Sequence, residues 1–263
     1  MEIIVERYIP RAINSDQALD FARQHETLIH TQNSAHEMPP HLKSILRRSI
    51  GAVPECEDRF FLASVDGQYA GRLWYGWGRH LDAIGNFGHF EVLEKYQGKG
   101  VGRTLLKRFE QDLHHGACRA SAIFCSTDSR WMVNICRTMG FRMVDDGQEH
   151  GDLFCPVSPN VPKNFKDFCC EYYQPSDKVY MRKGTMEYRH ELDCLLKICF
   201  RKMKLSYKAA GFDSFEAACH HAGQTRKPLY CFFTENGHCV GWMFQNCKIL
   251  YPLYSESEII QQF

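Results

Sequence analysis

The sequence predicts an α/β (α+β) fold, with a mixed, mostly antiparallel sheet flanked by helices. Three observations support this prediction. Two apolar runs are joined by Asp66-Gly67, which is the strongest β-hairpin signal in the chain. Apolar residues recur at helical spacing over 102–115 and 128–140, and short apolar runs stand beside these segments. Strands and helices therefore alternate, which is typical of a sheet with helices on its faces.

Local signals place each element of the first half. Asn14, Ser15 or Asp16 can cap the first helix, and Thr127 or Asp128 can cap the fourth. The expected elements, in chain order, are a strand at 3–9, helices at 14–30 and 42–50, the hairpin at 59–78, a strand at 85–93, a helix at 102–115, a strand at 119–127, a helix at 128–140 and a strand at 141–146.

The character of the chain changes near Pro156. We expect a first domain at 1–155, a Pro-rich connector at 156–176 and a C-terminal helical and hairpin extension at 177–263. The extension should hold a strand at 178–183 and an amphipathic helix at 187–203. Its segment Tyr230–Phe244 aligns without gaps on Phe60–Trp74. Two interpretations stay open: the extension is a degenerate half of a second unit, or it is a lid and dimer arm.

Composition limits the classes of partner. The 32 Lys plus Arg residues nearly balance the 31 Asp plus Glu residues, so no overall field favours nucleic acid or an anionic membrane. No apolar run approaches the roughly 18 residues of a spanning helix. Charges at Glu2, Glu6 and Arg7 interrupt the place where a signal peptide needs an apolar stretch. We expect a soluble, cytoplasmic protein that binds neither nucleic acid nor membrane.

The 13 cysteines are an odd number, so they cannot all pair within one chain. Most stand in apolar surroundings, where a free thiol packs as a small core residue. A zinc site would need close, regular pairs such as CxxC. The nearest candidates, which lack regular spacing, are Cys169-Cys170, His220-His221 and the set Cys231, His238, Cys239 and Cys247. We therefore expect reduced cysteines and no metal.

The segment "EKYQGKGVGRTLL", residues 94–106, stands between an expected strand and an expected helix. Backbone N–H groups at a helix start bind anions, and glycines let phosphate oxygens come close. A Walker motif would need glycine at Gln97 and lysine at Arg103, and the dinucleotide fingerprint also fails at Arg103. A third pattern, [Q/R]xxGx[G/A], fits Gln97, Gly100 and Gly102.

With this motif in this order of elements, the segment from Ile3 to Asp146 resembles the GNAT superfamily of acetyl-CoA-dependent N-acetyltransferases. The resemblance implies that the pyrophosphate of coenzyme A lies on the amides of the glycine loop and that the pantetheine arm pairs with the preceding strand. The residues implied to bind the coenzyme are Val92, Leu93, Gln97, Gly98, Lys99, Gly100, Val101, Gly102, Arg103, Thr104 and Ser129. Ser129 stands where the family has an asparagine.

Acetyl transfer needs a base, an oxyanion donor and a proton for the thiolate. By strand alternation His89 and Glu91 share one face, which makes both candidates for the base. The resemblance implies an oxyanion donor among the backbone N–H groups near Val92 or Leu93. The family's tyrosine, a proton donor, is replaced by Cys136; a thiol can donate a proton, and so can solvent.

The function expected from the resemblance is transfer of an acetyl group from acetyl-CoA to a primary amine of a small molecule by direct attack. Two alternatives stay open: a protein N-acetyltransferase, and a non-catalytic acyl-CoA-binding module, which the absent tyrosine favours. Few residues follow Phe244, so the extension has no room for its own coenzyme loop and helix. We expect one coenzyme site per chain, and a homodimer is compatible with the sequence.

Overall fold

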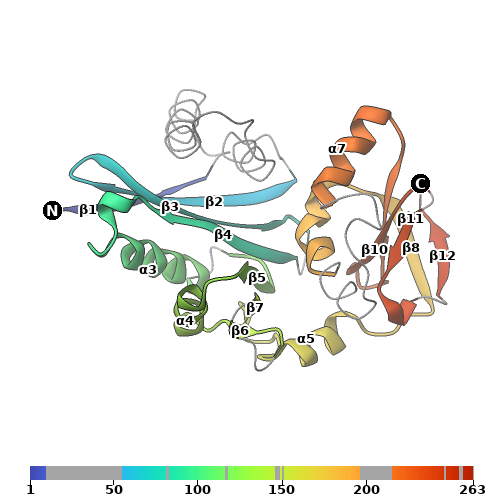
Figure 1. Cartoon of the computed structure of the whole chain (residues 1–263). Helices are drawn as coiled ribbons and strands as arrows, with labels where there is room; N and C mark the ends of the chain where they lie inside the picture. Colours follow the sequence, from blue (N-terminus) through green and yellow to red (C-terminus); the bar gives the residue numbers. More distant parts are fainter. Residues whose placement is uncertain are drawn as a thin grey trace. The chain divides into compact units, whose positions relative to one another are not determined.

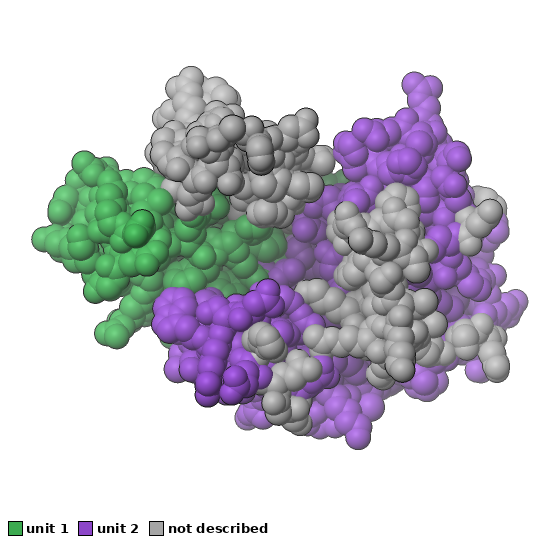
Figure 2. Space-filling view, viewed as in Figure 1, with its two compact units in different colours: residues 1–76, 87–118 green, residues 77–86, 119–263 purple. Residues whose placement is uncertain are grey.

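The computed structural model describes residues 1–9, 55–80, 83–115, 118–145, 149, 151–195, 215–245, 247–254 and 257–262 (Figure 1). The helices expected at 14–30 and 42–50 lie outside these residues, and so does the expected helix 187–203 beyond residue 195. The chain forms two compact units (Figure 2). The first unit comprises Met1–Gly76 and Phe87–Cys118, and the second comprises Trp77–Asn86 and Arg119–Phe263.

The strands are β1 (Ile3–Tyr8), β2 (Cys56–Val65), β3 (Gln68–Gly78), β4 (Ile84–Val92), β5 (Ala122–Thr127), β6 (Arg142–Met143), β7 (Gly151–Pro156), β8 (Lys178–Lys183), β9 (Leu229–Phe233), β10 (Cys239–Phe244), β11 (Cys247–Leu250) and β12 (Glu258–Gln261). The helices are α3 (Val101–His114), α4 (Arg130–Thr138), α5 (Phe165–Tyr172) and α7 (Phe215–Thr225), with short 3-10 turns η1 (Glu94–Tyr96), η2 (Met186–Tyr188) and η4 (Pro252–Tyr254). This mixed α/β architecture confirms the predicted fold class.

The first unit is built on an antiparallel meander. β1 pairs with β2 from Ile3 opposite Val65 onward. β2 and β3 are joined at Asp66 and Gly67, whose φ angles are 49° and 76°. Two consecutive left-handed residues are what a two-residue hairpin turn requires, because their twist matches that of the strands. The hairpin predicted from Asp66-Gly67 is confirmed.

Helix α3 packs on one face of this meander. Its Phe109 ring stacks on Phe87 of β4 with 4.8 Å between centroids and meets the Tyr75 ring of β3 edge-on at 5.1 Å. Asp112 is buried beside these rings, and its carboxylate accepts a hydrogen bond from the Tyr75 hydroxyl. The Arg7 guanidinium lies 2.5 Å from the same carboxylate. Burial, and then the bond to Asp112, raise the pKa of Tyr75, so the phenol stays neutral.

The strands are hydrogen-bonded in the order β1-β2-β3-β4-β5-β7-β6. β4 is parallel to β5, and the pairing joins Ile84–Asn86 to Ala122–Phe124, three residues on each strand. β5 continues antiparallel to β7 along its whole length. The parallel contact is therefore short, although β4 runs on to Val92.

The rest of the second unit holds a separate sheet with the order β11-β10-β9-β8-β12. Its core includes large fully buried side chains such as Trp242, Phe215 and Tyr254. The strand predicted at 178–183 is confirmed as β8, and the hairpin predicted at 230–244 is confirmed as β9 and β10. The C-terminal β12 is parallel to β8.

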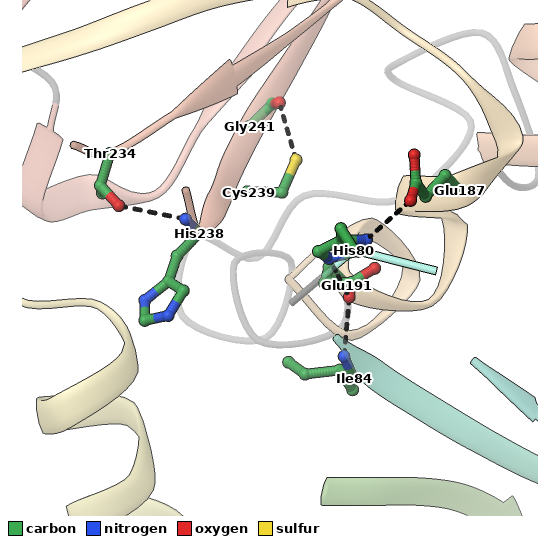
Figure 3. Close-up of polar contacts among 8 residues, drawn as sticks. All are labelled: His80, Ile84, Glu187, Glu191, Thr234, His238, Cys239 and Gly241. Carbon is green, nitrogen blue, oxygen red and sulfur yellow. Dashed lines mark hydrogen bonds and ion pairs between the residues drawn. The ribbon is translucent and has the colours of Figure 1, made fainter. Parts of the chain in front are cut away.

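A buried carboxylate, Glu191, ties this region to the start of β4. Its Oε1 accepts a hydrogen bond from the Ile84 backbone N–H at 2.7 Å and lies 2.8 Å from His80 Nε2 (Figure 3). The Glu191 side chain has no exposed surface, so these two contacts stand in for water at Oε1 only. The Tyr188 ring packs 5.2 Å from the His80 ring.

The described residues contain free cysteines and no metal cluster. The twelve cysteines in this part of the chain are free thiols, and eight of them are buried. No group of three His, Cys, Asp or Glu side chains among the same residues is placed to hold a metal ion. Within the described ranges, every helix is too short or too polar to cross a membrane.

Candidate active site

The glycine loop forms the start of α3. Gly98 and Gly100 have φ angles of 72° and 89°, a left-handed backbone that glycine adopts without a Cβ clash. Gly100 is the N-cap of α3, and its carbonyl accepts the Thr104 N–H at 3.0 Å. The first three N–H groups of a helix have no acceptor within it, and the first turn of α3 carries no acidic residue. This helix start is suited to bind an anion.

Gly102, the third glycine of the motif, has a packing role. A Cβ at this position would lie 3.1 Å from Phe90 Cζ and 3.5 Å from Val92 Cγ2. At Gly98, by contrast, a Cβ would meet no atom of the described residues within 4 Å. Gly102 therefore lets α3 approach β4 closely, while Gly98 is required by its backbone conformation and leaves open space beside the loop.

Side chains also hold the loop in place. Gln97 Nε2 donates to the Val92 carbonyl at 3.1 Å, which fastens the loop to the end of β4. The Tyr96 ring lies under two ammonium groups, Lys95 Nζ at 4.8 Å and Lys99 Nζ at 5.8 Å from its centroid. These cations lie beside the helix start, where they complement an anion. Arg103 is exposed on the first turn of α3.

A β-bulge interrupts β4 at His89. Phe87 packs on α3 through Phe109, and the next side chains that face α3 are Phe90 and Val92 beside Gly102. Two residues, rather than one, separate Phe87 from Phe90. The additional residue is accommodated at His89, whose φ angle is 49°. Bulges redirect side chains and often lie beside active sites; a left-handed residue other than glycine is strained.

The other face of β2, β3 and β4 carries a polar row, which we define as Asp58 on β2, Arg72 and Trp74 on β3, and His89 and Glu91 on β4. Arg72 Nη2 lies 2.9 Å from Glu91 Oε2. The His89 ring contacts Trp74 edge-on, with centroids 5.5 Å apart. Trp74 Nε1 in turn donates to Asp58 Oδ1 at 2.8 Å in a buried hydrogen bond. His89 and Glu91 are thus both held by β3.

The two backbone N–H groups considered as oxyanion donors differ. The Leu93 N–H donates to the Ala70 carbonyl at 2.9 Å, so it is part of the sheet. Successive N–H groups of a strand point to opposite edges, which turns the Val92 N–H away from β3. Of the two, Val92 therefore has the suitable direction.

Cys136 and Ser129 belong to the second unit. Cys136 lies on the buried side of α4 with no exposed surface. A hydrogen bond from the Cys125 thiol lowers the pKa of Cys136, and burial acts in the opposite direction. Ser129, rather than the expected Thr127 or Asp128, caps α4: its Oγ accepts the Met132 N–H. The prediction of Thr127 as the cap was wrong. The Thr127 hydroxyl accepts the N–H of Ser129, two residues further along, instead of an N–H of the first turn of α4.

Sequence reasoning missed Arg72 and Asp58. One signal for Arg72 was present, since it is a single charge within the apolar run of β3 and has only 6% of its side chain exposed. Asp58 has no comparable signal, because only the fold brings its carboxylate to the Trp74 indole.

Comparison with known proteins gives one family match and a set of similar solved structures. The model of the acetyltransferase (GNAT) family matches residues 18–141. No curated protein matches the chain in sequence. Solved structures similar to this chain include an acyl-CoA N-acyltransferase from Pseudomonas aeruginosa, 14% identical, covering 59% of this chain and 99% of that one, with a TM-score of 0.41.

Two further structures are similar to the same extent. An acetyltransferase of the GNAT family from Staphylococcus aureus is 15% identical, with 60% of this chain and 100% of that chain covered and a TM-score of 0.40. A chain of the NatC complex bound to Gag peptide and CoA is 18% identical, with 60% and 100% covered and a TM-score of 0.38. None of these similarities assigns a role to a residue of this chain.

Proposed function

We propose that this chain, which matches the model of the acetyltransferase (GNAT) family over residues 18–141, transfers an acetyl group from acetyl-CoA to a primary amine of a small molecule. The observation that supports the proposal best is the glycine loop, in which Gly98 and Gly100 have a left-handed backbone directly before α3. A glycine loop at the start of a helix is suited to the pyrophosphate of coenzyme A.

The coenzyme contacts divide by their chemistry. Of the backbone N–H groups from Gly98 to Thr104, those of Lys99 and Thr104 already donate to the carbonyls of Tyr96 and Gly100, so the remaining ones would hold the pyrophosphate. The Lys99 and Arg103 side chains would add charge. Gln97 would act indirectly, since its side chain fastens the loop to Val92. The pantetheine arm would pair with β4 beyond Asn86, where the ladder to β5 ends. Ser129 Oγ already accepts the Met132 N–H as the cap of α4, so any contribution from it would come from its hydroxyl proton or its second lone pair.

We propose His89 as the base. An imidazole titrates near neutral pH, and its strained backbone is held by Trp74, as expected of a functional position. Glu91, the other candidate, is already paired with Arg72. His89 would take a proton from the acceptor ammonium, and the neutral amine would attack the acetyl carbonyl to form the C–N bond.

The remaining steps concern charge and the leaving group. The Val92 N–H would donate to the oxygen that becomes negative during attack. Collapse of the tetrahedral species breaks the C–S bond, and the coenzyme leaves as a thiolate that takes up one proton. Solvent would supply that proton. Cys136 is the alternative donor, although a buried cysteine in a helix commonly has a packing role.

The test is an amine panel with acetyl-CoA, in which a thiol-reactive dye detects free coenzyme A and mass spectrometry detects the product. We expect acceptor-dependent thiol release, and release that depends on a protein N-terminus or lysine would identify the protein-acetylating alternative. Tight coenzyme binding without thiol release from any acceptor would favour the non-catalytic module. Calorimetry should give one coenzyme per chain, and a value near two would contradict a single site.

A further inference from the structure

The second sheet repeats the geometry of the first unit. The order β8-β9-β10-β11 is the same antiparallel meander as β1-β2-β3-β4, and β8 has the six-residue length of β1. A glycine marks the same place in both. A Cβ at Gly71 would lie 2.5 Å from the Glu91 carbonyl, and one at Gly241 would lie 2.3 Å from the Ile249 carbonyl. Glu91 and Ile249 are thus equivalent positions.

The equivalence continues through the turn after the fourth strand. The Leu93 N–H donates to Ala70 at 2.9 Å, and the Tyr251 N–H donates to Val240 at 2.8 Å. In both copies a 3-10 turn follows and ends on a buried tyrosine, Tyr96 or Tyr254.

The next hydrogen bonds also match, from Lys99 N–H to Tyr96 at 3.4 Å and from Ser257 N–H to Tyr254 at 3.2 Å. The copies diverge one residue later. Gly100 caps α3, whereas its equivalent Glu258 begins β12. The second copy therefore ends where the coenzyme loop would be completed, and it presents a carboxylate there.

The facing side chains on the third and fourth strands differ between the copies. Arg72 faces Glu91 in the first, and Trp242 is paired with Ile249 in the second. Trp74 contacts His89 in the first, and Phe244 is paired with Cys247 in the second. The same strand pair therefore folds within this chain with apolar partners in place of the charged ones.

We infer that the Arg72–Glu91 pair serves the reaction rather than the fold, with Arg72 as a positioning residue that holds the Glu91 carboxylate beside His89. Arg72 is buried and Glu91 is partly buried, with 6% and 22% of their side chains exposed, so the pair must offset the desolvation of the arginine and part of that of the glutamate. A well-packed apolar pair is often equally or more stable than an ion pair in such surroundings. The second copy shows that this pair of strands also folds with apolar side chains at the two positions. This inference rests on the proposed function, because it assigns the pair to the acceptor side of that site.

The test replaces the Arg72–Glu91 ion pair of the first unit by apolar side chains. In the double variant Arg72→Leu with Glu91→Leu, we expect the melting temperature to equal or exceed that of the unchanged protein. We expect kcat to fall by about 100-fold while the coenzyme dissociation constant changes less than about 2-fold, since the loop is untouched. Arg72→Trp with Glu91→Ile, the side chains of the second copy, is a second double variant in case packing fails in the first.

Single variants and a control complete the design. Glu91→Leu alone should be less stable than the double variant, because it removes the Glu91 carboxylate from the buried Arg72 guanidinium while the charge of Arg72 remains. Arg72→Lys should recover most of the kcat that Arg72→Leu loses, which a purely structural role would not predict. The control is Arg130→Ala with Glu149→Ala, an exposed ion pair of 3.5 Å, for which we expect unchanged turnover and stability.

Two outcomes would overturn the inference: both double variants unfold more readily than the unchanged protein, or a double variant folds and keeps kcat within about 3-fold of it. Failure of the proposed function would look different. In that case the unchanged protein would bind coenzyme A and turn over no amine. The stability comparison would still decide whether the pair supports the fold.

Discussion

Replacement of Gly98 by alanine separates the two properties of the glycine loop, backbone strain and ligand contact. A Cβ at Gly98 meets no atom within 4 Å, so the substitution creates no clash, but the φ angle of 72° is unfavourable for alanine. A left-handed residue with a Cβ costs about 1–2 kcal/mol. For a chain of this size we expect a fall in melting temperature of about 2–8 °C.

Coenzyme affinity should fall as well, because the methyl group enters the space beside the amides that would hold the pyrophosphate. We expect a loss of at least about 10-fold, equivalent to about 1.4 kcal/mol of binding free energy. Calorimetric titration with coenzyme A measures it, and thermal unfolding measures the strain in the same sample.

Gly67→Ala is the matched control. Gly67 has a φ angle of 76° and no atom within 4 Å of an added Cβ, so its strain is the same, but it lies in the β2–β3 turn. The control should lose similar stability and keep its coenzyme affinity. The reasoning would be refuted if Gly98→Ala bound coenzyme A as tightly as the unchanged protein, or if both variants lost affinity equally.

Three further predictions concern buried polar groups. Asp58→Leu should lower the free energy of unfolding by about 1–3 kcal/mol, because it removes the Asp58 carboxylate that accepts the buried Trp74 N–H, and it should also lower kcat. Asp58→Asn keeps an acceptor and should retain most of the stability and most of kcat. Denaturation and steady-state kinetics distinguish the two variants. Tyr75→Phe should destabilise the first unit by about 1 kcal/mol through its lost bond to Asp112, with coenzyme affinity unchanged by calorimetry. Burial raises the pKa of Tyr188 to about 12 from its usual 10.0, so above about pH 10 the folded state retains a proton that the unfolded chain releases. The free energy of unfolding should therefore fall between about pH 10 and 12. Tyr188→Phe should reduce that fall, which denaturation curves at about pH 9 to 11 would measure.

The internal comparison between the two sheets bears on how the C-terminal extension is interpreted. Of the two interpretations that the sequence leaves open, we favour a partial second copy, because its hydrogen bonds follow those of the first from the Gly241 contact to Ser257. An arm for dimer contacts would not need this correspondence. A homodimer remains a prediction, which sedimentation or light scattering would test.

Local features were determined by the sequence alone. The Asp66-Gly67 turn, the amphipathic pattern of α3 and the glycines before it could be predicted, because backbone preference and helical periodicity act over a few neighbouring residues. The same holds for the alignment of the two hairpins. The motif predicts an anion site on the loop at Gly98 and Gly100, and the structure adds the left-handed angles that favour glycine there.

Tertiary structure decided the contacts within the polar row and which glycines of the motif serve packing rather than the loop. The Arg72 partner of Glu91 and the Ala70 carbonyl that accepts the Leu93 N–H both lie on β3, about 20 residues earlier in the chain. The partners of Trp74 lie on two other strands, Asp58 on β2 and His89 on β4. Gly102 also depends on tertiary structure, because the close approach of Phe90 leaves little room for a Cβ at this position. A strand period can assign a face, but only the packed neighbour shows whether a carboxylate on that face meets water, a substrate or an arginine.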